Sequence, residues 1–413
     1  MSTPSIPSPA ISFVGRKNSG KTTLLEKLIA NLADKGLRIA TIKHHGHPDF
    51  DIDIPGRDSY RHRAAGAQST TILSDVRFAQ ITELSTPRSC ESAISQLSGY
   101  DLVLVEGFKQ ASLAHIELFR AENPRDIEAA AKLPDVWKAQ VQNKSLGTTS
   151  TPVHQNALPV AVITDIPTVQ ANANQFQVPC FTFDDIELLA SFLQDRFARP
   201  KLSVVVQAGG ESKRMGVPKD TVSFLGKPLI CHVLERVSSL ADELIVTTND
   251  PDRLQFLKKT YPAIRFVPDQ LKTRGSIPGL YTALLCAHHD LVGIVACDML
   301  DFPVALLAQE ALLLRPCAHP DLGVVLPKSE QGIEPFAGVY RKELCCSKLE
   351  QFISEKGSSA SLRTFLDELP CGYIDCTSPA KCARFGGSFL NANTPEDLIT
   401  AKDILTISSE YLY

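Results

Sequence analysis

Hydrophobic residues in this chain gather in short unbroken runs, and two of these runs end in a glycine-rich turn. The first segment is Ile11–Ala30, ISFVGRKNSGKTTLLEKLIA, and the second is Leu202–Gly216, LSVVVQAGGESKRMG. Continuous runs of Val, Ile and Leu are typical of central strands in parallel sheets, which are buried on both faces. Each segment therefore predicts a strand, a turn and a helix at the beginning of a parallel sheet.

The same alternation of strands and helices continues after each start. The first half predicts further strands at 38–42, 70–73, 101–105 and 159–163, and a closing amphipathic helix at 184–197. The second half predicts strands at 243–247, 264–267, 291–296 and 323–326, with helices that include 228–239 and 277–288. This pattern predicts an α/β protein with two three-layer α/β sandwich domains.

A domain boundary is expected at the short junction 198–201, where Pro200 prevents the preceding helix from continuing. We therefore predict one domain at 1–198 and a second at 199–413. The polar and unpatterned segment 143–156 is interpreted as a loop within the first domain.

Composition excludes several classes of protein. Of 413 residues, 44% are hydrophobic, and no apolar run is long enough for a membrane helix. The first ten residues, MSTPSIPSPA, lack the basic and apolar regions of a secretory signal, so we expect a cytoplasmic protein. A net charge of −4 gives no global basic footprint for nucleic acid. The 11 cysteines include no CxxC pair, which favours reduced thiols over disulfides or a zinc site.

The first glycine-rich turn, GRKNSGKT, matches the phosphate-binding P-loop pattern GxxxxGK[ST] between a strand and a helix. In such a loop, backbone N–H groups and the helix N-terminus bind phosphate oxygens. Lys21 would reach the β- and γ-phosphates, and the Thr22 hydroxyl would bind Mg²⁺. The predicted nucleotide-binding residues of this turn are Gly15, Asn18, Ser19, Gly20, Lys21 and Thr22. The alternative is a strand–helix turn without a ligand.

Two further features accompany the first site. Glu106 leaves the strand 101–105 at its carboxyl end, where ligands of α/β sheets gather, and is the better candidate to complete the site. Asp101 enters the same strand, and its alternative role is solvation of the strand edge. The segment 43–47, KHHGH, is expected to contact nucleotide or a partner. A metal site there is the minor alternative, since no ligand spacing matches.

The second glycine-rich turn lacks the GKT sequence and is therefore not another P-loop. Transfer of a nucleotidyl group requires backbone amides and cations around the α-phosphate. The turn and its flanks supply both, in Gln207, Ala208, Gly209, Gly210, Arg214 and Lys219. Arg214 and Lys219 are predicted to be catalytic. A Gly-Gly turn alone would be weak evidence.

A carboxylate is expected opposite this turn. Asp298 follows the apolar strand 291–296, where an aspartate is costly to bury unless it is paired or binds a cation. We predict that Asp298 is a catalytic residue and the Mg²⁺ ligand, with Asp301 a weaker candidate. The alternative role is an N-cap for the following helix, which suits Asp301 better.

The first half resembles the molybdopterin-guanine dinucleotide biosynthesis adapter proteins. The resemblance rests on GRKNSGKTTL, on KHxxH followed by GRDSYRHRAAGA, and on LVLVEGFK, within Ile11–Phe197. It implies a P-loop NTPase-like domain that binds GTP and assists guanylylation. No NKxD motif is present, so the preference for guanine rests on this resemblance.

The second half resembles the molybdenum cofactor guanylyltransferases, through GGxxxRMGxxK, GSIPGL, EPFAGVY and NANTPED. The resemblance implies a Rossmann-like nucleotidyltransferase in which Asn249 and Asp269 contact guanosine. It also implies that Glu334, Asn391 and Asn393 lie toward the pterin. The chain departs from the family pattern at Ser276–Pro278 and at Leu300.

Together, these features predict a bifunctional protein that transfers GMP from GTP to molybdopterin or molybdenum cofactor, with Mg²⁺ as the metal. Molybdoenzymes or cofactor-insertion proteins are the expected partners, and the oligomeric state is left open. The alternatives are transfer from CTP, transfer to a sugar phosphate, and a GTP-driven cofactor carrier whose second domain is inactive.

Overall fold

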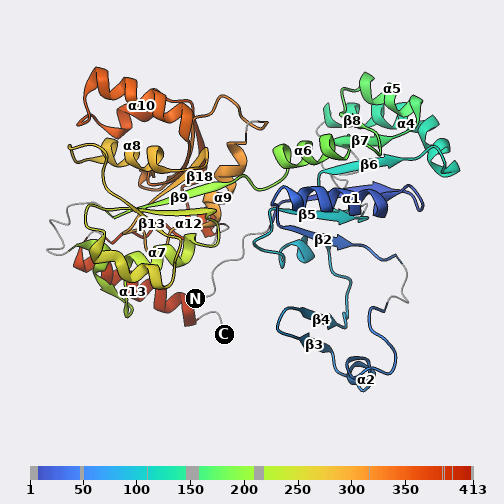
Figure 1. Ribbon diagram of the computed structural model, residues 1–413, viewed down its shortest axis with the longest axis horizontal. Coiled ribbons are helices and arrows are strands. Elements are labelled where there is room, and N and C mark those ends of the chain that lie inside the picture. The colour runs from blue at the N-terminus through green and yellow to red at the C-terminus, as the bar shows by residue number, and fades with distance from the viewer. Residues whose placement is uncertain are drawn as a thin grey trace. The chain divides into compact units, whose positions relative to one another are not determined.

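The computed structural model describes residues 8–46, 51–108, 110–145, 158–208, 218–315, 317–383, 385, 387–392 and 394–410. The chain divides into two compact units, and the boundary between them falls between Ser191 and Phe192, within helix α6 (Ile186–Arg196). Each unit is an α/β layer structure, as the alternation of strands and helices predicted (Figure 1).

The first unit is built on a parallel sheet, which has six strands among the described residues. In spatial order these are β2 (Ile39–Lys43), β5 (Leu102–Glu106), β1 (Ala10–Gly15), β6 (His115–Phe119), β7 (Ala161–Thr164) and β8 (Cys180–Phe181). Central strand β1 pairs with β5 on one side and with β6 on the other, so its carboxyl end lies at the centre of the sheet.

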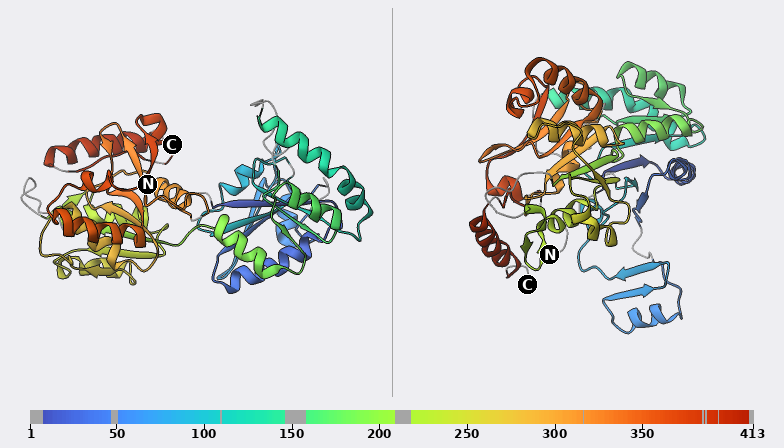
Figure 2. Two further views of the ribbon diagram at one scale, coloured as in Figure 1. Left: turned by 90° about the horizontal axis from the view of Figure 1, so that it is seen from above. Right: turned by 60° about the vertical axis from the view of Figure 1, so that its left-hand side comes forward.

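Helices cover both faces of this sheet. Helices α1 (Lys21–Asp34) and α6 lie on one face, and α4 (Pro124–Ser145) lies on the other (Figure 2). Val103 and Val105 pack with α3 (Cys90–Ile94), while Phe119 and Val162 pack with α4 and α5 (Pro167–Gln175). The apolar residues of the strands thus form the core on both sides.

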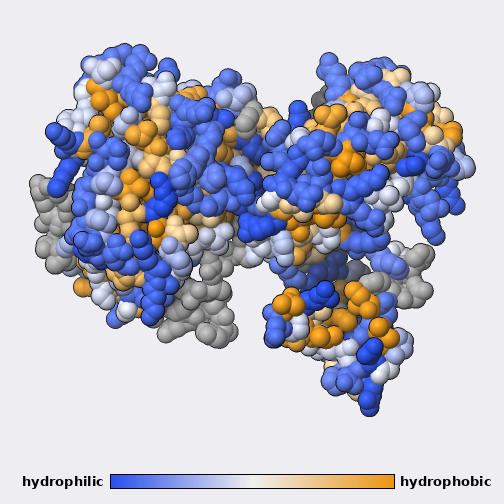
Figure 3. All heavy atoms as spheres, in the orientation of Figure 1, coloured by the Kyte–Doolittle hydropathy of each residue, from blue (hydrophilic) through white to orange (hydrophobic). Residues whose placement is uncertain are grey.

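The prediction that residues 70–73 join the parallel sheet is wrong. Strand β3 (Ser69–Leu73) instead forms an antiparallel hairpin with β4 (Phe78–Thr82), next to helix α2 (Asp58–Ala64). The Ser74 amide donates to the Arg77 carbonyl at 2.9 Å, which closes the turn locally. Leu73 and Phe78 are 77% and 66% exposed, and apolar surface is visible on this hairpin in Figure 3. An apolar run therefore led to a sheet assignment for residues that are not in the core.

The second unit contains a mixed sheet, with eight strands among the residues described. Four parallel strands come first, in the order β13 (Arg265–Val267), β12 (Glu243–Thr247), β9 (Leu202–Gln207) and β14 (Leu291–Ala296). The sheet continues through β17 (Ala337–Arg341) and β15 (Val324–Ser329), and β15 also pairs with β16 (Gly332–Ile333) and β18 (Cys371–Cys376). Strand β17 runs antiparallel to β14 and β15.

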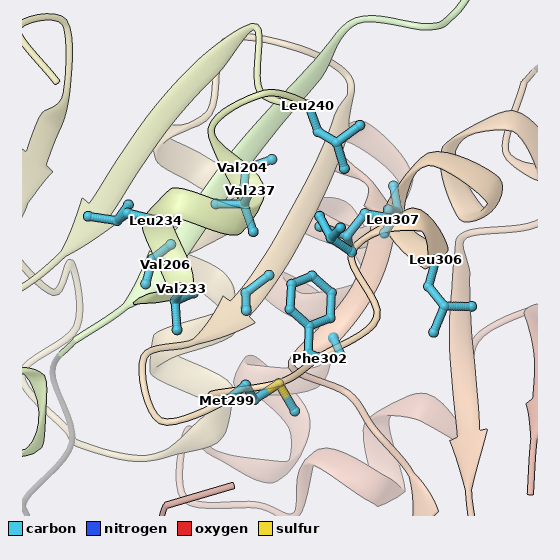
Figure 4. Close-up of a cluster of buried hydrophobic side chains, with 14 of the residues drawn as sticks. Val204, Val206, Val233, Leu234, Val237, Leu240, Met299, Phe302, Leu306 and Leu307 are labelled. Atoms are coloured by element: carbon cyan, nitrogen blue, oxygen red, sulfur yellow. The ribbon is translucent and has the colours of Figure 1, made fainter. Parts of the chain in front are cut away.

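This sheet is also the middle of three layers. Val204 and Val206 belong to the core cluster formed with helices α7 (Leu229–Val237) and α9 (Ala305–Leu313), and Figure 4 shows them beside the α7 valines, with Phe302 in the same cluster. On the opposite face, Val205 packs with α8 (Ser276–Cys286) and α10 (Lys342–Lys356).

Shorter elements complete the second unit. They are η2 (Lys219–Thr221), β10 (Ser223–Phe224), β11 (Lys227–Pro228), η3 (Asp252–Lys259), α11 (Leu362–Leu366), α12 (Pro379–Ala383) and α13 (Pro395–Glu410).

All 11 cysteines are free thiols, and burial raises the pKa of several of them, including Cys90 to about 11. In the portion of the chain that the structure describes, no helix is both long and apolar enough to cross a bilayer.

Glu310 on α9 is fully buried, and neither carboxyl oxygen has a hydrogen-bond partner among the described residues. Burial therefore raises the pKa of this carboxyl well above its ordinary value. When the pKa of a carboxyl is higher in the folded chain than in the unfolded chain, the protein becomes less stable as pH rises. The loss begins above the pKa of the carboxyl in the unfolded chain, ~4.3. The loss is about 1 kcal/mol per pH unit until the folded pKa is reached.

We expect Glu310→Gln to raise the melting temperature of the full chain by several degrees at pH 7. Its advantage over the unsubstituted protein should shrink toward zero near pH 4. Differential scanning fluorimetry between pH 4 and 8 measures both values. A difference that does not change with pH would contradict this account of Glu310.

Candidate functional site

The first candidate site is the loop between β1 and α1. Asn18 and Gly20 adopt φ angles of 68° and 80°, a conformation that favours glycine and that asparagine tolerates. A Cβ atom at Gly15 would lie only 3.3 Å from Cβ of Ser19 and 3.2 Å from Cβ of Leu118. The Lys21 ammonium donates to the carbonyls of Gly15 and Arg16 at 3.0 and 2.6 Å. The loop thus curves around the Lys21 amine, as a phosphate-binding loop requires.

A buried aspartate that the sequence reasoning missed supports this loop. Asp126, in the first turn of α4, is fully buried and accepts hydrogen bonds from Ser19 Oγ at 2.7 Å and the Arg120 amide at 3.1 Å. It also pairs with Arg16 at 3.3 Å, and Asn123 donates to it at 3.0 Å. The sequence Asn-Pro-Arg-Asp is a common helix start, so a capping role concealed this contact with the loop.

Glu106 lies at the carboxyl end of β5, beside the start of α1. Its carboxylate accepts a hydrogen bond from Thr22 Oγ1 at 3.0 Å and pairs with Lys43 at 3.4 Å. Asp101 lies at the other end of β5 and is not solvated: it is 1% exposed and accepts from the Arg38 amide at 2.8 Å. The structure therefore places Glu106, and not Asp101, next to the P-loop.

The histidine segment contributes backbone and ring contacts to the same edge. The His44 amide donates to the Glu106 carbonyl at 2.9 Å, and its ring lies 4.5 Å from the ring of Phe108. His47 lies outside the described residues. Among the residues that are described, no three His, Cys, Asp or Glu side chains are grouped to hold a metal ion.

The second candidate site lies along one edge of the mixed sheet. Gln207, Asn249, Asp269 and Asp298 each end or closely follow a parallel strand, and these strands are adjacent in the order β13, β12, β9 and β14. Because neighbouring parallel strands end at the same edge, the sheet brings these side chains to one side of the molecule. Gly209, Gly210, Arg214 and Asn393 lie outside the described residues.

Lys219 and Asp298 form an ion pair at this edge. Lys219 Nζ lies 2.9 Å from Asp298 Oδ2, and the two side chains are 20% and 19% exposed. Asp298 follows β14, while Lys219 belongs to the single turn η2 and is 79 positions away in the chain. A lysine and an aspartate that lie together and are mostly shielded from water can balance the charge of a bound phosphate group.

Asn249 and Asp269, the two residues expected near guanosine, are hydrogen-bonded to each other. Asn249 Nδ2 donates to Asp269 Oδ2 at 2.8 Å, and the Asp269 amide donates to Asn249 Oδ1 at 3.0 Å. Gln207 lies against Gly279 of α8, since a Cβ there would be 3.4 Å from the Gln207 amide nitrogen. That nitrogen is buried and has no hydrogen-bond partner within the described part of the chain. The edge therefore presents one amide–carboxylate pair beside one buried amide donor. The Ala208 amide, by contrast, donates to the Thr247 carbonyl at 3.0 Å and is occupied within the sheet.

The residues expected toward the acceptor lie at the same edge. Asn391 forms a β-bridge with Met299, directly after Asp298, and its buried Oδ1 has no hydrogen-bond partner among the residues that the structure describes. Glu334 lies just before β17, and because β17 is antiparallel, the beginning of this strand meets the end of β14. The Glu334 carboxylate accepts a hydrogen bond from Ser329 Oγ at 2.7 Å.

Asp301 is a structural residue and does not cap the following helix. Its carboxylate pairs with Arg236 and accepts from the amide and hydroxyl of Ser388 at 3.1 and 2.9 Å. Helix α9 begins after Val304 with no side-chain cap. The N-cap role expected for Asp301 is therefore wrong.

Comparisons with known proteins identify both units. Residues 10–139 match the family profile described as molybdopterin guanine dinucleotide synthesis protein B. Residues 204–370 match the profile described as the MobA-like NTP transferase domain.

Individual relatives agree with these assignments. The chain is 46% identical to the molybdopterin-guanine dinucleotide biosynthesis adapter protein of Escherichia coli, over 27% of this chain and 66% of that protein. It is 41% identical to the adapter protein of Haemophilus influenzae, over 29% of this chain and 67% of that one. A probable molybdenum cofactor guanylyltransferase of Nostoc is 30% identical, over 48% of this chain and 88% of that protein. The chain therefore belongs, through its first unit, to the molybdopterin-guanine dinucleotide biosynthesis adapter proteins and, through its second, to the molybdenum cofactor guanylyltransferases.

Proposed function

We propose that the second unit transfers GMP from GTP to molybdopterin or molybdenum cofactor, yielding the guanine dinucleotide form and pyrophosphate. The carrying observation is the Lys219–Asp298 pair at the sheet edge that also holds Asn249 and Asp269. An oxygen of the acceptor's terminal phosphate attacks the α-phosphorus of GTP. The bond from that phosphorus to the oxygen bridging to the β-phosphate breaks, and pyrophosphate leaves with the electron pair. Family membership supports guanylyl over cytidylyl transfer and over transfer to a sugar phosphate.

The side chains at this edge have distinct roles in the proposal. Lys219 balances the charge that develops on the phosphate oxygens, together with Arg214 and the amides of Gly209 and Gly210. Asn249 and Asp269 bind the guanosine, while Asn391, Asn393 and Glu334 face the acceptor. Protein nucleophiles have no part in this chemistry, so catalysis consists of positioning and charge stabilisation.

The oxygen-rich side chains at both sites fit a magnesium ion. At the second site Asp298 would hold it, in a segment whose next residue, Met299, is bridged to Asn391. At the first site the ligands would be the Thr22 hydroxyl and the Glu106 carboxylate, which already lie 3.0 Å apart. Carboxylate, hydroxyl and amide oxygens are the donors that Mg²⁺ prefers. When bound, the ion would neutralise part of the phosphate charge.

For the first unit we propose GTP binding in the P-loop and an adapter role toward the second. The aligned segments span about two thirds of the two adapter relatives, so this role is a proposal for the present chain. We place the functional division at the junction 198–201. Molybdoenzymes or cofactor-insertion proteins remain the predicted partners.

Lys219→Ala tests the second site. Removing the ammonium beside Asp298 should lower kcat/KM for GTP by about 10- to 100-fold, because one main electrostatic stabiliser is lost. The fold should persist, since Lys219 lies in a single short turn outside the sheet. Lys356→Ala is the matched control, because Lys356 forms an ion pair with Glu368 on a different part of the unit. Steady-state dinucleotide formation by the full chain is the measurement, and equal values for both variants would refute the proposed role.

A further inference from the structure

One guanidinium in the second unit lies between two carboxylates. Arg253, at the beginning of η3, donates from Nη2 to Asp220 Oδ2 at 2.7 Å and from Nη1 to Asp250 Oδ2 at 2.9 Å. Asp220 is only 2% exposed, and the Arg253 side chain is 28% exposed. A buried carboxylate of this kind depends on its partner, because an unpaired charge in the protein interior is strongly destabilising.

The first of these carboxylates is fixed to the proposed phosphate side of the site. Asp220 directly follows Lys219, whose amine lies 2.9 Å from Asp298. Both residues belong to the single turn η2, which is closed by long hydrogen bonds of 3.2 and 3.3 Å at Val222 and Thr221. So short a turn has little rigidity of its own. The turn packs against α7, and the Asp220 side chain adds a buried ion pair that ties it to Arg253.

The second carboxylate is fixed to the proposed guanosine side. Asp250 directly follows Asn249, which holds Asp269 through two hydrogen bonds. The backbone amide of Arg253 also donates to Asp250 Oδ1 at 3.3 Å. Arg253 thus holds the segment after β12 as well as η2.

Helix η3, which carries Arg253, is anchored in the hydrophobic core. Leu254 and Leu257 are 0% and 2% exposed and belong to the hydrophobic core that the sheet forms with α7 and α9. Arginine suits the position because its planar guanidinium carries several donors in fixed directions and can bind two carboxylates at once. A lysine, with a single charged nitrogen, would not reproduce that geometry.

We propose that Arg253 is a positioning residue that couples the phosphate-binding and guanosine-binding sides of the second site, through Asp220 and Asp250. The inference rests on the function proposed above. Arg253 touches no substrate in this scheme. It sets where the Lys219 amine lies with respect to the α-phosphate, and a displacement of about 1 Å at such a group lowers turnover by roughly 100-fold.

The test is a double-mutant cycle in the full chain. Arg253→Met should lower kcat by about 10- to 100-fold and also raise the KM for GTP. In the Lys219→Ala background the same change should lower kcat by less than about 3-fold, because residues that act through one another are not additive. Arg253→Lys, which retains one charge, should have an intermediate kcat and serves if Arg253→Met does not fold.

Arg265→Met is the matched control. Arg265 pairs with Glu243 at the opposite end of β12, far along the strand from Asn249. Its loss should lower the melting temperature but leave kcat and KM unchanged in both backgrounds.

A second readout separates this inference from the proposed function. GTP affinity, measured by calorimetry in the Lys21→Ala background to remove the first site, should be weaker in Arg253→Met. If the parent chain forms no dinucleotide, the proposed function fails, and this affinity still tests the bridge. A folded Arg253→Met or Arg253→Lys variant with parental affinity overturns the inference. So does an equal loss of kcat with and without Lys219.

Discussion

Asp298→Asn should reduce guanylyl transfer by at least ~100-fold, the scale expected when a main electrostatic group of an active site is lost. The substitution keeps the size of the side chain but removes the charge that pairs with Lys219 at 2.9 Å. It also removes the strongest oxygen donor proposed for Mg²⁺ at this site. The measurement is the rate of dinucleotide formation by the full chain with saturating GTP, molybdopterin and magnesium.

Asp375, a surface aspartate that also pairs with a lysine, provides the control. Asp375 pairs with Lys381 at 2.5 Å, and both side chains are about half exposed. Asp375→Asn should leave the rate unchanged, since exposed ion pairs contribute little. A rate near that of the parent chain in folded Asp298→Asn would show that another residue carries this role.

Lys21→Ala should strongly weaken GTP binding and abolish GTP hydrolysis in the first unit while sparing most guanylyl transfer. The Lys21 amine lies over the loop carbonyls at 2.6 and 3.0 Å, where it would meet the β- and γ-phosphates. Loss of such a charged contact weakens binding by roughly 100-fold, equivalent to about 3 kcal/mol. Dinucleotide formation should stay within about 3-fold of the parent, because Lys219 and Asp298 belong to the other unit.

Lys27→Ala serves as the control on the same helix, because Lys27 is exposed on α1, away from the loop. Hydrolysis of GTP, release of pyrophosphate and formation of dinucleotide should be followed in the same samples. If Lys21→Ala lowered transfer as much as it lowers hydrolysis, the first unit would be part of the catalytic machinery. A chain shortened to residues 199–413 would then be inactive unless the first unit were added separately.

The central strands were predictable from sequence because their burial leaves a continuous apolar signature. Strands β9 and β14 carry such runs: β14 has the predicted bounds, and β9 begins at the predicted Leu202. Strand β6 was missed because His115 and Glu117 interrupt its apolar pattern, although it lies beside β1. Strand β17 was missed for a related reason: Gly338 weakens the signature of the strand that turns the sheet antiparallel.

A candidate site residue could be predicted from the sequence where a polar side chain directly follows a predicted strand. Glu106 and Asp298 each follow a predicted strand, so the parallel-sheet rule placed them at the correct edge. Asp126 and Arg253 were not foreseen, because each acts on a loop far away in sequence. Asp126 reaches Ser19 across 107 positions, and Arg253 reaches Asp220 across 33. Only the folded chain shows such partners.

The antiparallel direction of β17 has a consequence for how this enzyme could diversify. The proposed guanosine and phosphate contacts come from segments that follow parallel strands, whereas Glu334, proposed to face the acceptor, comes from the turn that precedes β17. That turn belongs to the hairpin of β15, β16 and β17, and Gly332 in it has a φ of 125° and open space around its Cβ position. Changes of length or sequence in this hairpin would remodel the acceptor side alone. In the proposed function, the hairpin on the acceptor side and the nucleotide-binding residues thus lie in separate stretches of the chain, and we expect the two preferences to change independently.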